Sequence, residues 1–260
     1  MKNKVILISI DGMRPDGFLQ CGNPFSNMMQ TQGAYTLNAK TVFPPITLPC
    51  HTSLFHSVPP QRHGVLNNTY APPVHPVDSL FTQIKNAGGK SAMFYGWEHL
   101  RDVARPGTLV ESRFLKALAF DDTDRILTES ALDCIARHSP DFVFLYLVET
   151  DEKGGHDNGW MTKAYLDYIS VAVDCVKRVL DEAGEGYHVI VTADHGGHDR
   201  MHGVDCPEDM TIPMFFFGNA FQKGERMENV SILDLAPTIA DLLGILPAEE
   251  WEGKSLLKGN

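Results

Sequence analysis

The stretch Val5–Gly12, VILISIDG, decides the fold class. An apolar run this short is typical of a strand buried on both faces of a sheet, and it ends at an aspartate. The same pattern recurs at Phe142–Val148, which continues into Asp151, and at His188–Thr192, which continues into Asp194. We therefore expect three strands that each deliver a carboxylate at the carboxyl end.

Segments with helical spacing separate these runs, and the alternation predicts the architecture. We expect an α/β fold, a three-layer sandwich with a mostly parallel central sheet. Residues 1–260 are expected to form a single catalytic domain, with 97–120 as a possible small cap over the site. The further strands expected are Ser91–Tyr95 and Pro213–Phe217, and the helices are Val77–Ala87, Asp122–Arg137, Thr162–Ala183 and Ile232–Leu243.

Composition excludes several classes of protein. The 260 residues carry a formal net charge of -11, which argues against a basic surface for duplex nucleic acid. Five cysteines without a CxxC pair do not form a disulfide framework or a structural zinc site. No apolar run approaches the roughly 20 residues that span a bilayer, and none is long enough for a signal-peptide core. A cytoplasmic protein without a membrane partner is expected, and nothing in the sequence indicates an oligomeric state.

Three carboxylates are expected at one edge of the sheet. Asp11, Asp151 and Asp194 each follow a strand, and ligands of open α/β sheets bind at the carboxyl ends of the strands. Unpaired, the three charges would repel one another, and at least one carboxyl group would keep its proton. Divalent cations resolve this conflict more fully. The sequence therefore predicts a metal site at this edge.

Histidines next to these aspartates support a metal site. His156 follows Asp151, His195 follows Asp194 directly, and His198 and His202 follow within a glycine-containing loop. Mixed His/Asp ligation without cysteine suits zinc, manganese or a similar ion. By distance along the chain alone, either His198 or His202 could be the ligand.

Thr47 stands in the segment FPPITLPCH, Phe43–His51. Pro49 favours the first turn of a helix, which would put Thr47 at a helix N-terminus, where backbone N–H groups attract an anion. A nearby cation could activate the Thr47 hydroxyl as a nucleophile. A plain N-cap explains the same spacing equally well.

Six motifs, in the expected order, make the sequence resemble the alkaline phosphatase superfamily, and most of all its type I phosphodiesterase/nucleotide pyrophosphatase family. The resemblance runs from residue 6 to residue 257. The segments that carry these motifs are Ile8–Asp16, Phe43–His51, His63–Asn68, Thr150–His156, Ala193–Gly196 and His202–Asp205. The tail, Asp234–Gly244 and Gly253–Leu257, resembles the closing helix and strand of the superfamily.

The resemblance implies an alkaline phosphatase-like fold and a hydrolase that uses two divalent metal ions, with zinc expected and manganese as the alternative. It makes Thr47 the nucleophile and gives Asn68 the role of holding a phosphoryl oxygen. It favours His202 over His198 as a ligand. The ligands that it implies are Asp11, Thr47, Asp194 and His195 for one ion, and Asp151, His156 and His202 for the other.

The implied activity is that of a phosphodiesterase/nucleotide pyrophosphatase with a phospho-threonine intermediate. Three carboxylates and ionised Thr47 would balance two dications, so the site would accept a small phosphorylated substrate, of which a nucleotide is one candidate. The alternatives are a phosphonoacetate hydrolase-like enzyme, a phosphomonoesterase, a sulfatase-like hydrolase, a phosphotransferase or mutase, and a non-catalytic binder.

One spacing departs from the family pattern. The usual second ligand pair is Asp-x-x-x-His, and here one extra glycine intervenes between Asp151 and His156. We expect Gly154 and Gly155 to bulge and leave His156 in place.

Overall fold

The computed structural model describes residues 1, 3–72, 76–184 and 186–258. Within them the chain forms one seven-stranded sheet with the order β2-β7-β6-β1-β5-β3-β4. The strands are β1 (Lys4–Ile10), β2 (Ala34–Lys40), β3 (Ser91–Tyr95), β4 (Leu109–Phe114), β5 (Phe142–Leu147), β6 (Tyr187–Thr192) and β7 (Thr211–Phe217). The α/β fold with a mostly parallel sheet is confirmed, and the five strands expected from the sequence all belong to this sheet.

Strand register brings the three expected carboxylates to one edge. β1 pairs in parallel with β5 on one side and with β6 on the other, with Ile10 opposite Leu147 and Ser9 opposite Thr192. The next residues of all three strands therefore leave the sheet at the same level. The backbone N–H of Asp11 still donates to the carbonyl of Leu147, at 2.9 Å, so the first loop starts directly at the sheet edge.

β7 runs antiparallel to its neighbour β6, although its apolar sequence looked like that of the parallel strands. The reason is the connection between them. Residues 193–210 leave and re-enter the sheet at the same edge, without the crossover that a parallel strand requires. The loop therefore stays at the carboxyl edge.

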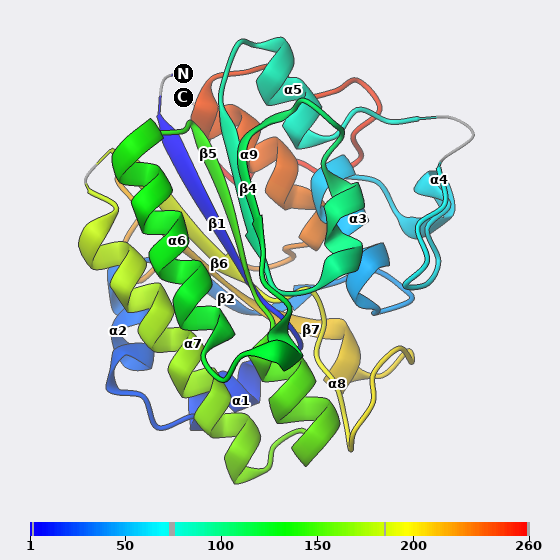
Figure 1. The fold of residues 1–260 in the computed structure, drawn as a ribbon, viewed down its shortest axis with the longest axis vertical. Coiled ribbons are helices and arrows are strands. Elements are labelled where there is room, and N and C mark those ends of the chain that lie inside the picture. The colour runs from blue at the N-terminus through cyan, green and yellow to red at the C-terminus, as the bar shows by residue number, and fades with distance from the viewer. Residues whose placement is uncertain (2, 73–75, 185, 259–260) are drawn as a thin grey trace.

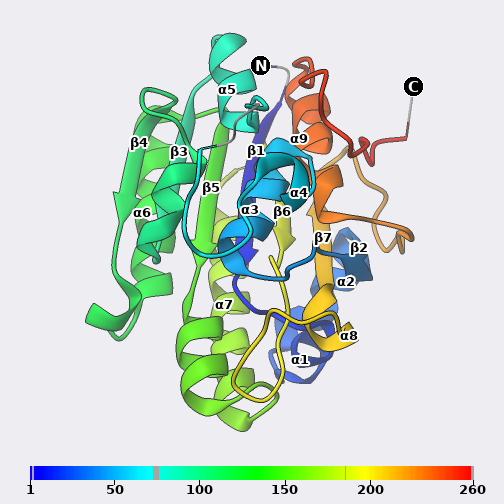
Figure 2. The ribbon, with the colours of Figure 1, turned by 90° about the vertical axis from the view of Figure 1, so that its right-hand side faces the viewer.

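Helices cover both faces of the sheet, which explains why the central strands are apolar on both sides (Figure 1). α6 and α7 lie on one face with α1 and α2, and α3, α5 and α9 lie on the other (Figure 2). The bounds are α1 (Pro15–Gln20), α2 (Pro24–Gln32), α3 (Thr47–His56), α4 (Pro60–His63), α5 (Leu80–Asn86), α6 (Thr123–His138), α7 (Lys163–Glu182), α8 (Pro207–Met210) and α9 (Leu235–Leu243). Short helices are η1 (Glu98–Val103), η2 (Ala117–Ala119), η3 (Thr150–His156) and η4 (Ile232–Asp234).

α7 shows why the helical predictions succeeded. Its Thr162 cap accepts a hydrogen bond from the N–H of Tyr165, and its buried residues include Ile169, Val173 and Val176. This spacing keeps one apolar stripe against the neighbouring elements. The four expected helices form within three residues of their predicted ends, except that the first turn of the last one, Ile232–Asp234, is the 3₁₀ helix η4.

Part of the segment expected to form a cap joins the sheet instead. Leu109–Phe114 is β4, which pairs in parallel with β3 at the edge of the sheet. β4 and β2 were not expected as strands, because both expose polar residues and lack a continuous apolar run. Whether the rest of 97–120 covers the site, and whether 1–260 is one domain, stays a prediction.

None of the helices in the described part of the chain combines the length and the apolar character needed to cross a bilayer. The five cysteines are free thiols, and four of them are buried. This agrees with the expectation that no disulfide framework supports the fold.

Candidate metal centre

One cluster of candidate ligands lies at the carboxyl ends of the central strands β1 and β6. We call it the inner group, and it consists of Asp11, Asp194 and His195. Their ligand atoms lie within 4.8 Å of one another, and all three side chains are buried. His195 Nε2 is 3.4 Å from Asp11 Oδ1 and 3.3 Å from Asp194 Oδ2. Strand ends hold all three residues in place, so little of this geometry depends on flexible loops.

Asp151, His156 and His202, which we call the outer group, lie beside the inner group. Asp151 and His202 form a second cluster within 4.8 Å that also includes His195. The ring of His202 stacks on that of His195 with centroids 3.8 Å apart. His156 joins through Asp151, with Nε2 3.3 Å from Oδ2. The two groups are thus adjacent, with His195 between them.

A π-helix explains the extra glycine between Asp151 and His156. Residues Thr150–His156 form η3, a single π-helical segment. In a π-helix residues five apart lie one above the other, as residues four apart do in an α-helix. The inserted residue therefore leaves the two side chains on the same face.

All three histidines present the same nitrogen to the centre. The Nδ1 atoms of His195, His202 and His156 lie 2.8, 2.9 and 3.0 Å from backbone carbonyls. A carbonyl only accepts, so each Nδ1 carries the hydrogen and donates it. The Nε2 atoms of His195 and His202 keep their lone pairs for a ligand, an arrangement that is usual for metal-binding histidines. The Nε2 of His156 faces Asp151 Oδ2 and is available to a ligand once its proton leaves.

Each of the three carboxylates keeps one buried oxygen without a hydrogen-bond donor. The hydroxyl of Tyr146 donates to Asp11 Oδ2, and the N–H groups of Gly12 and His195 donate to Asp194 Oδ1. Asp11 Oδ1, Asp194 Oδ2 and Asp151 Oδ1 are buried without a hydrogen-bond partner. Unpaired buried oxygens are costly, and cations would satisfy them. The residues present therefore fit two divalent cations.

The pKa shifts point the same way. Burial, reinforced by the charges of Asp151 and Asp194, raises the pKa of Asp11, and burial raises that of Asp194. Burial lowers the pKa of His195, and burial together with His195 lowers that of His202 to about 4. The hydrogen bond with Asp151 raises the pKa of His156 to about 9. Neutral imidazoles beside crowded carboxylates suit cation binding, which would displace the proton on His156.

Thr47 is the first residue of α3, next to the inner group. Its Oγ1 lies 3.2 Å from His195 Nε2. Pro49 occupies the first turn, where its missing N–H costs nothing. The N–H of Leu48 donates to Asn68 Oδ1 at 3.1 Å, so the Asn68 side chain is tied to the start of the helix. Among the described residues no acceptor takes the N–H of Thr47, which leaves this group available for an anion.

The other histidines lie outside the two groups. His198 Nδ1 is 2.8 Å from Asp209 Oδ1, so His202 and not His198 faces Asp151. His51 Nδ1 lies 2.8 Å from the carbonyl of Thr47, and His63 Nδ1 accepts from the N–H of Val65. The His51 contact lies within α3, and its Nδ1 is also 3.5 Å from Asp194 Oδ2, whereas His63 holds the loop that follows α4.

Sequence reasoning missed three residues that support the centre. Tyr146 lies opposite Ser9 in β5 and reaches Asp11, and the one signal was a tyrosine in an otherwise apolar strand. Asp209 is fully buried and accepts from the N–H groups of Gly203 and Val204, next to His202. Trp160 is buried, and its indole N–H donates to the carbonyl of Gly12, directly after Asp11.

Comparisons with known proteins give a family match and several relatives. The model of the family described as type I phosphodiesterase / nucleotide pyrophosphatase matches residues 5–210. A 2,3-bisphosphoglycerate-independent phosphoglycerate mutase of Clostridioides difficile (strain 630) is 28% identical over 138 residues, which cover 50% of this chain and 26% of the mutase. The chain spans 18% to 29% of the length of the curated relatives it matches.

Two solved structures share the fold. An inactive variant of murine ectonucleotide pyrophosphatase / phosphodiesterase 5, in complex with AMP, has a TM-score of 0.79 at 15% identity, covering 94% of this chain and 96% of its own. A 2-O GAG sulfatase has a TM-score of 0.77 at 19% identity, covering 98% and 73%. At this identity the likeness establishes the architecture.

Proposed function

Because the chain belongs to the type I phosphodiesterase/nucleotide pyrophosphatase family, we propose that it hydrolyses phosphate diesters through a phospho-threonine intermediate at Thr47. One observation carries the proposal. The Thr47 hydroxyl stands at a helix N-terminus beside His195, and the neighbouring carboxylates of Asp11 and Asp194 keep unpaired buried oxygens. This arrangement supports Thr47 as the nucleophile, next to a candidate anion site and a candidate cation site.

Two divalent cations fit the ligand sets. The inner group with Thr47 would hold one ion, and the outer group would hold the other. Zinc suits the mixed nitrogen and oxygen donors, with manganese as the alternative. When bound, such ions lower the pKa of an alcohol and of water, and they neutralise charge on the transferring phosphate.

The chain's own residues would then divide the chemistry. Thr47 Oγ1 attacks phosphorus, and the bond from phosphorus to the leaving oxygen breaks. The free N–H of Thr47 and the amide of Asn68 donate to a phosphoryl oxygen, in the manner of an oxyanion hole. Water next attacks the phospho-threonine, so that the bond from Thr47 Oγ1 to phosphorus breaks and phosphate leaves with the remaining ester group.

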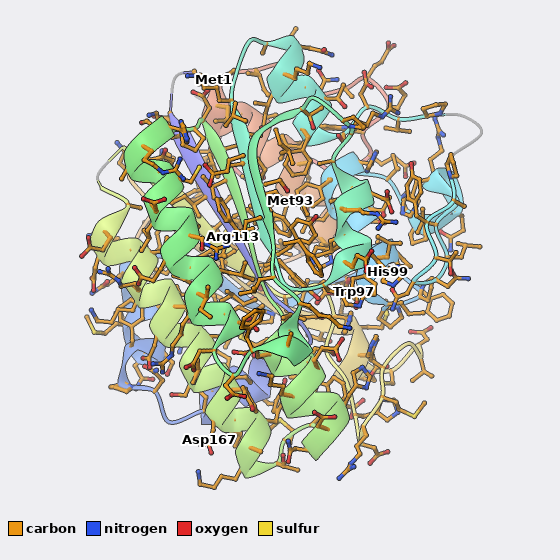
Figure 3. The ribbon with its side chains drawn as sticks, in the orientation of Figure 1. Met1, Met93, Trp97, His99, Arg113 and Asp167 are labelled. Atoms are coloured by element: carbon orange, nitrogen blue, oxygen red, sulfur yellow. The ribbon has the colours of Figure 1, made fainter. Side chains whose placement is uncertain are left out.

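A cavity lined largely by the segment that follows β3 is a candidate place for the leaving group. It measures about 230 Å³, and its walls include Trp97, His99, Lys116 and Glu152, the residue after Asp151. The rings of Trp97 and His99 lie 4.5 Å apart in the segment after β3 (Figure 3). The aromatic side chains and the cationic Lys116 in the cavity wall suit a planar, phosphorylated group. A nucleotide is therefore a candidate substrate, and the AMP bound to the murine neighbour supports this choice.

A substrate panel tests this proposal. Purified protein loaded with zinc, and separately with manganese, is assayed with an aryl phosphodiester, an aryl monoester, a phosphonate and an aryl sulfate. We expect the diester to have the highest kcat/KM, and Thr47→Ala to abolish its turnover while both ions stay bound. Preference for the monoester, the phosphonate or the sulfate would instead identify one of the alternative hydrolases, and full activity of Thr47→Ala would remove the nucleophile.

A phosphotransferase or mutase is the second candidate, and the matches to phosphoglycerate mutases favour it. In that reaction a second hydroxyl, in place of water, takes the phosphoryl group from Thr47. Product analysis with an added alcohol acceptor distinguishes the two candidates, because only the transferase yields a new ester in excess over phosphate. The cytoplasmic location expected from the sequence stays a prediction.

A further inference from the structure

Trp160 lies against three glycines from three different ligand loops. They are Gly12 after Asp11, Gly155 before His156, and Gly197 after His195. A methyl carbon added to Gly197 would lie 2.2 Å from Cε2 of the indole, and one added to Gly155 would lie 2.5 Å from Cη2. At Gly12 the same carbon would lie 3.3 Å from Cζ2. The loop backbones therefore rest directly on the ring.

Hydrogen bonds fix the ring in this place. The indole N–H donates to the carbonyl of Gly12 at 2.9 Å, and the hydroxyl of Tyr165 donates to the same oxygen at 2.8 Å. The backbone N–H of Trp160 donates to the carbonyl of Asp199 at 2.8 Å, in the loop that leads to His202. One residue thus bonds to the first ligand loop and to the last.

The ring also borders the outer ligands themselves. Its centroid lies 5.2 Å from that of His156, nearly perpendicular to it, and 6.1 Å from that of His202. A planar, buried side chain with two torsions keeps these neighbours at fixed distances better than a flexible one. Two-metal sites need their ions about 3.5–4 Å apart, so small displacements of one ligand loop against another are costly.

We propose that Trp160 is a positioning residue that sets the separation of the inner and outer cation groups. The proposal for Trp160 rests on one part of the proposed function, namely that both groups bind cations. The indole touches loops of both groups, so its loss lets each loop move independently. Metal affinity then falls at both groups, and the phosphoryl transfer that needs both ions slows.

Trp251 provides a matched control. Its indole N–H also donates to a backbone carbonyl, that of Asp78, at 2.8 Å, and its side chain is partly buried, whereas that of Trp160 is buried. Asp78 and Trp251 lie in segments that carry none of the expected ligands. Trp251→Phe therefore removes the same kind of hydrogen bond without touching a ligand loop.

The test measures zinc binding and catalysis in the full chain. Zinc affinity and stoichiometry are determined by competition with a chromogenic chelator for the wild type, Trp160→Phe and Trp251→Phe, and folding is checked by circular dichroism. We expect Trp160→Phe to stay folded, to bind zinc about 10- to 100-fold more weakly, and to lose kcat for an aryl phosphodiester with little change in KM. Trp251→Phe should match the wild type in all three measurements.

A purely structural role predicts a different outcome. In that case the metal-free Trp160→Phe protein would be less stable, but its folded form would bind two zinc ions with wild-type affinity, and this result would overturn the proposal. Gly197→Ala gives an independent check, because its added carbon displaces the ring without changing Trp160, and it should weaken zinc binding in the same way. Wild-type protein that binds zinc but hydrolyses no ester would refute the proposed function, while the zinc affinities would still decide the role of Trp160.

Discussion

The inner and outer groups are built on different kinds of structure. Asp11 and Asp194 follow central strands, and the inner side chains are at most 3% exposed. In the outer group, Asp151 and His156 belong to a π-helix and His202 belongs to an irregular loop, and the side chain of His156 is 39% exposed. The inner group therefore resists displacement, and the outer group depends on packing by its neighbours.

This difference predicts how the two ions behave. Ligands on a rigid sheet edge need no ordering when an ion binds, so the inner ion should bind more tightly and exchange more slowly. The outer ion should be lost first on treatment with a chelator. The following changes test this contrast, from the largest expected effect on turnover to the smallest.

Thr47→Ala removes the nucleophile at the inner group. We expect turnover of an aryl phosphodiester to fall by roughly 10⁴-fold or more, as for nucleophiles in other enzymes. Two zinc ions should remain bound, because Asp11, Asp194 and His195 still hold the inner one. Thr52→Ala is the control, since its hydroxyl donates within the same helix to Leu48. Loss of both ions from Thr47→Ala would contradict the rigid inner group.

Asp194→Asn tests the inner ligands themselves. The amide keeps the shape and the Oδ1 acceptor but removes the charge, so we expect about 10³-fold lower turnover and loss of the inner ion. Zinc stoichiometry by elemental analysis measures this directly. Asp141→Asn, at the opposite edge of the sheet, should change neither quantity. A variant that still binds two ions with wild-type affinity would rule out Asp194 as a ligand.

His156→Ala tests the outer group. Because 39% of this side chain is exposed, its removal should leave the inner group in place, and we expect the outer ion to bind about 10- to 100-fold more weakly. Activity should fall accordingly and recover when zinc is added in excess. His138→Ala, an exposed histidine at the end of α6, is the control. Failure of excess zinc to restore activity would show that the outer group is as rigid as the inner one.

Deletion of Gly154 tests the π-helix. The deletion restores the four-residue spacing of an α-helix, which keeps Asp151 and the histidine on one face. We expect activity within about ten-fold of the wild type, by the same assay. Gly155→Ala should be more damaging, because its added carbon would lie 2.5 Å from the Trp160 ring. Equal damage from the two changes would mean that the π-helix itself is required.

Asp124 holds the backbone that leads into the outer group. From its buried carboxyl group we predict that the stability of the protein depends on pH. It accepts from the N–H groups of Val148 and Glu149, just before η3, and burial together with Glu149 raises its pKa from 3.8 to about 8. The folded protein therefore holds this proton more tightly than the unfolded chain. Its stabilising contribution is complete below about pH 4 and is lost as the pH rises through about 8.

Urea unfolding between pH 5.5 and 8.5 measures this effect. The free energy of unfolding should fall with pH by at most about 1.4 kcal/mol per unit from this one group. Asp124→Asn cannot titrate, so its stability should change less over the same range. Of all the variants, Asp124→Asn should change turnover at a fixed pH the least, because Asp124 touches no ligand. Parallel pH profiles for the two proteins would show that Asp124 is ionised throughout.

Sequence patterns identified the strands whose residues are buried along their whole length. Central strands such as Val5–Ile10 are buried on both faces, so their apolar runs are visible in any window. β2 and β4 lie at the two sheet edges, where one neighbour is missing and polar residues are tolerated. Their strand character comes from pairing, not from local sequence.

By itself, the sequence determined the fold class and the three aspartates at strand ends, because strand length and burial are local properties and parallel strands end together. It also indicated the histidines and Thr47 as candidates. Only the tertiary structure decided that η3 is a π-helix that keeps Asp151 and His156 together, and that Tyr146, Asp209 and Trp160 support the ligands. The physical reason is that these features depend on contacts between residues far apart in the chain, and no local periodicity encodes them.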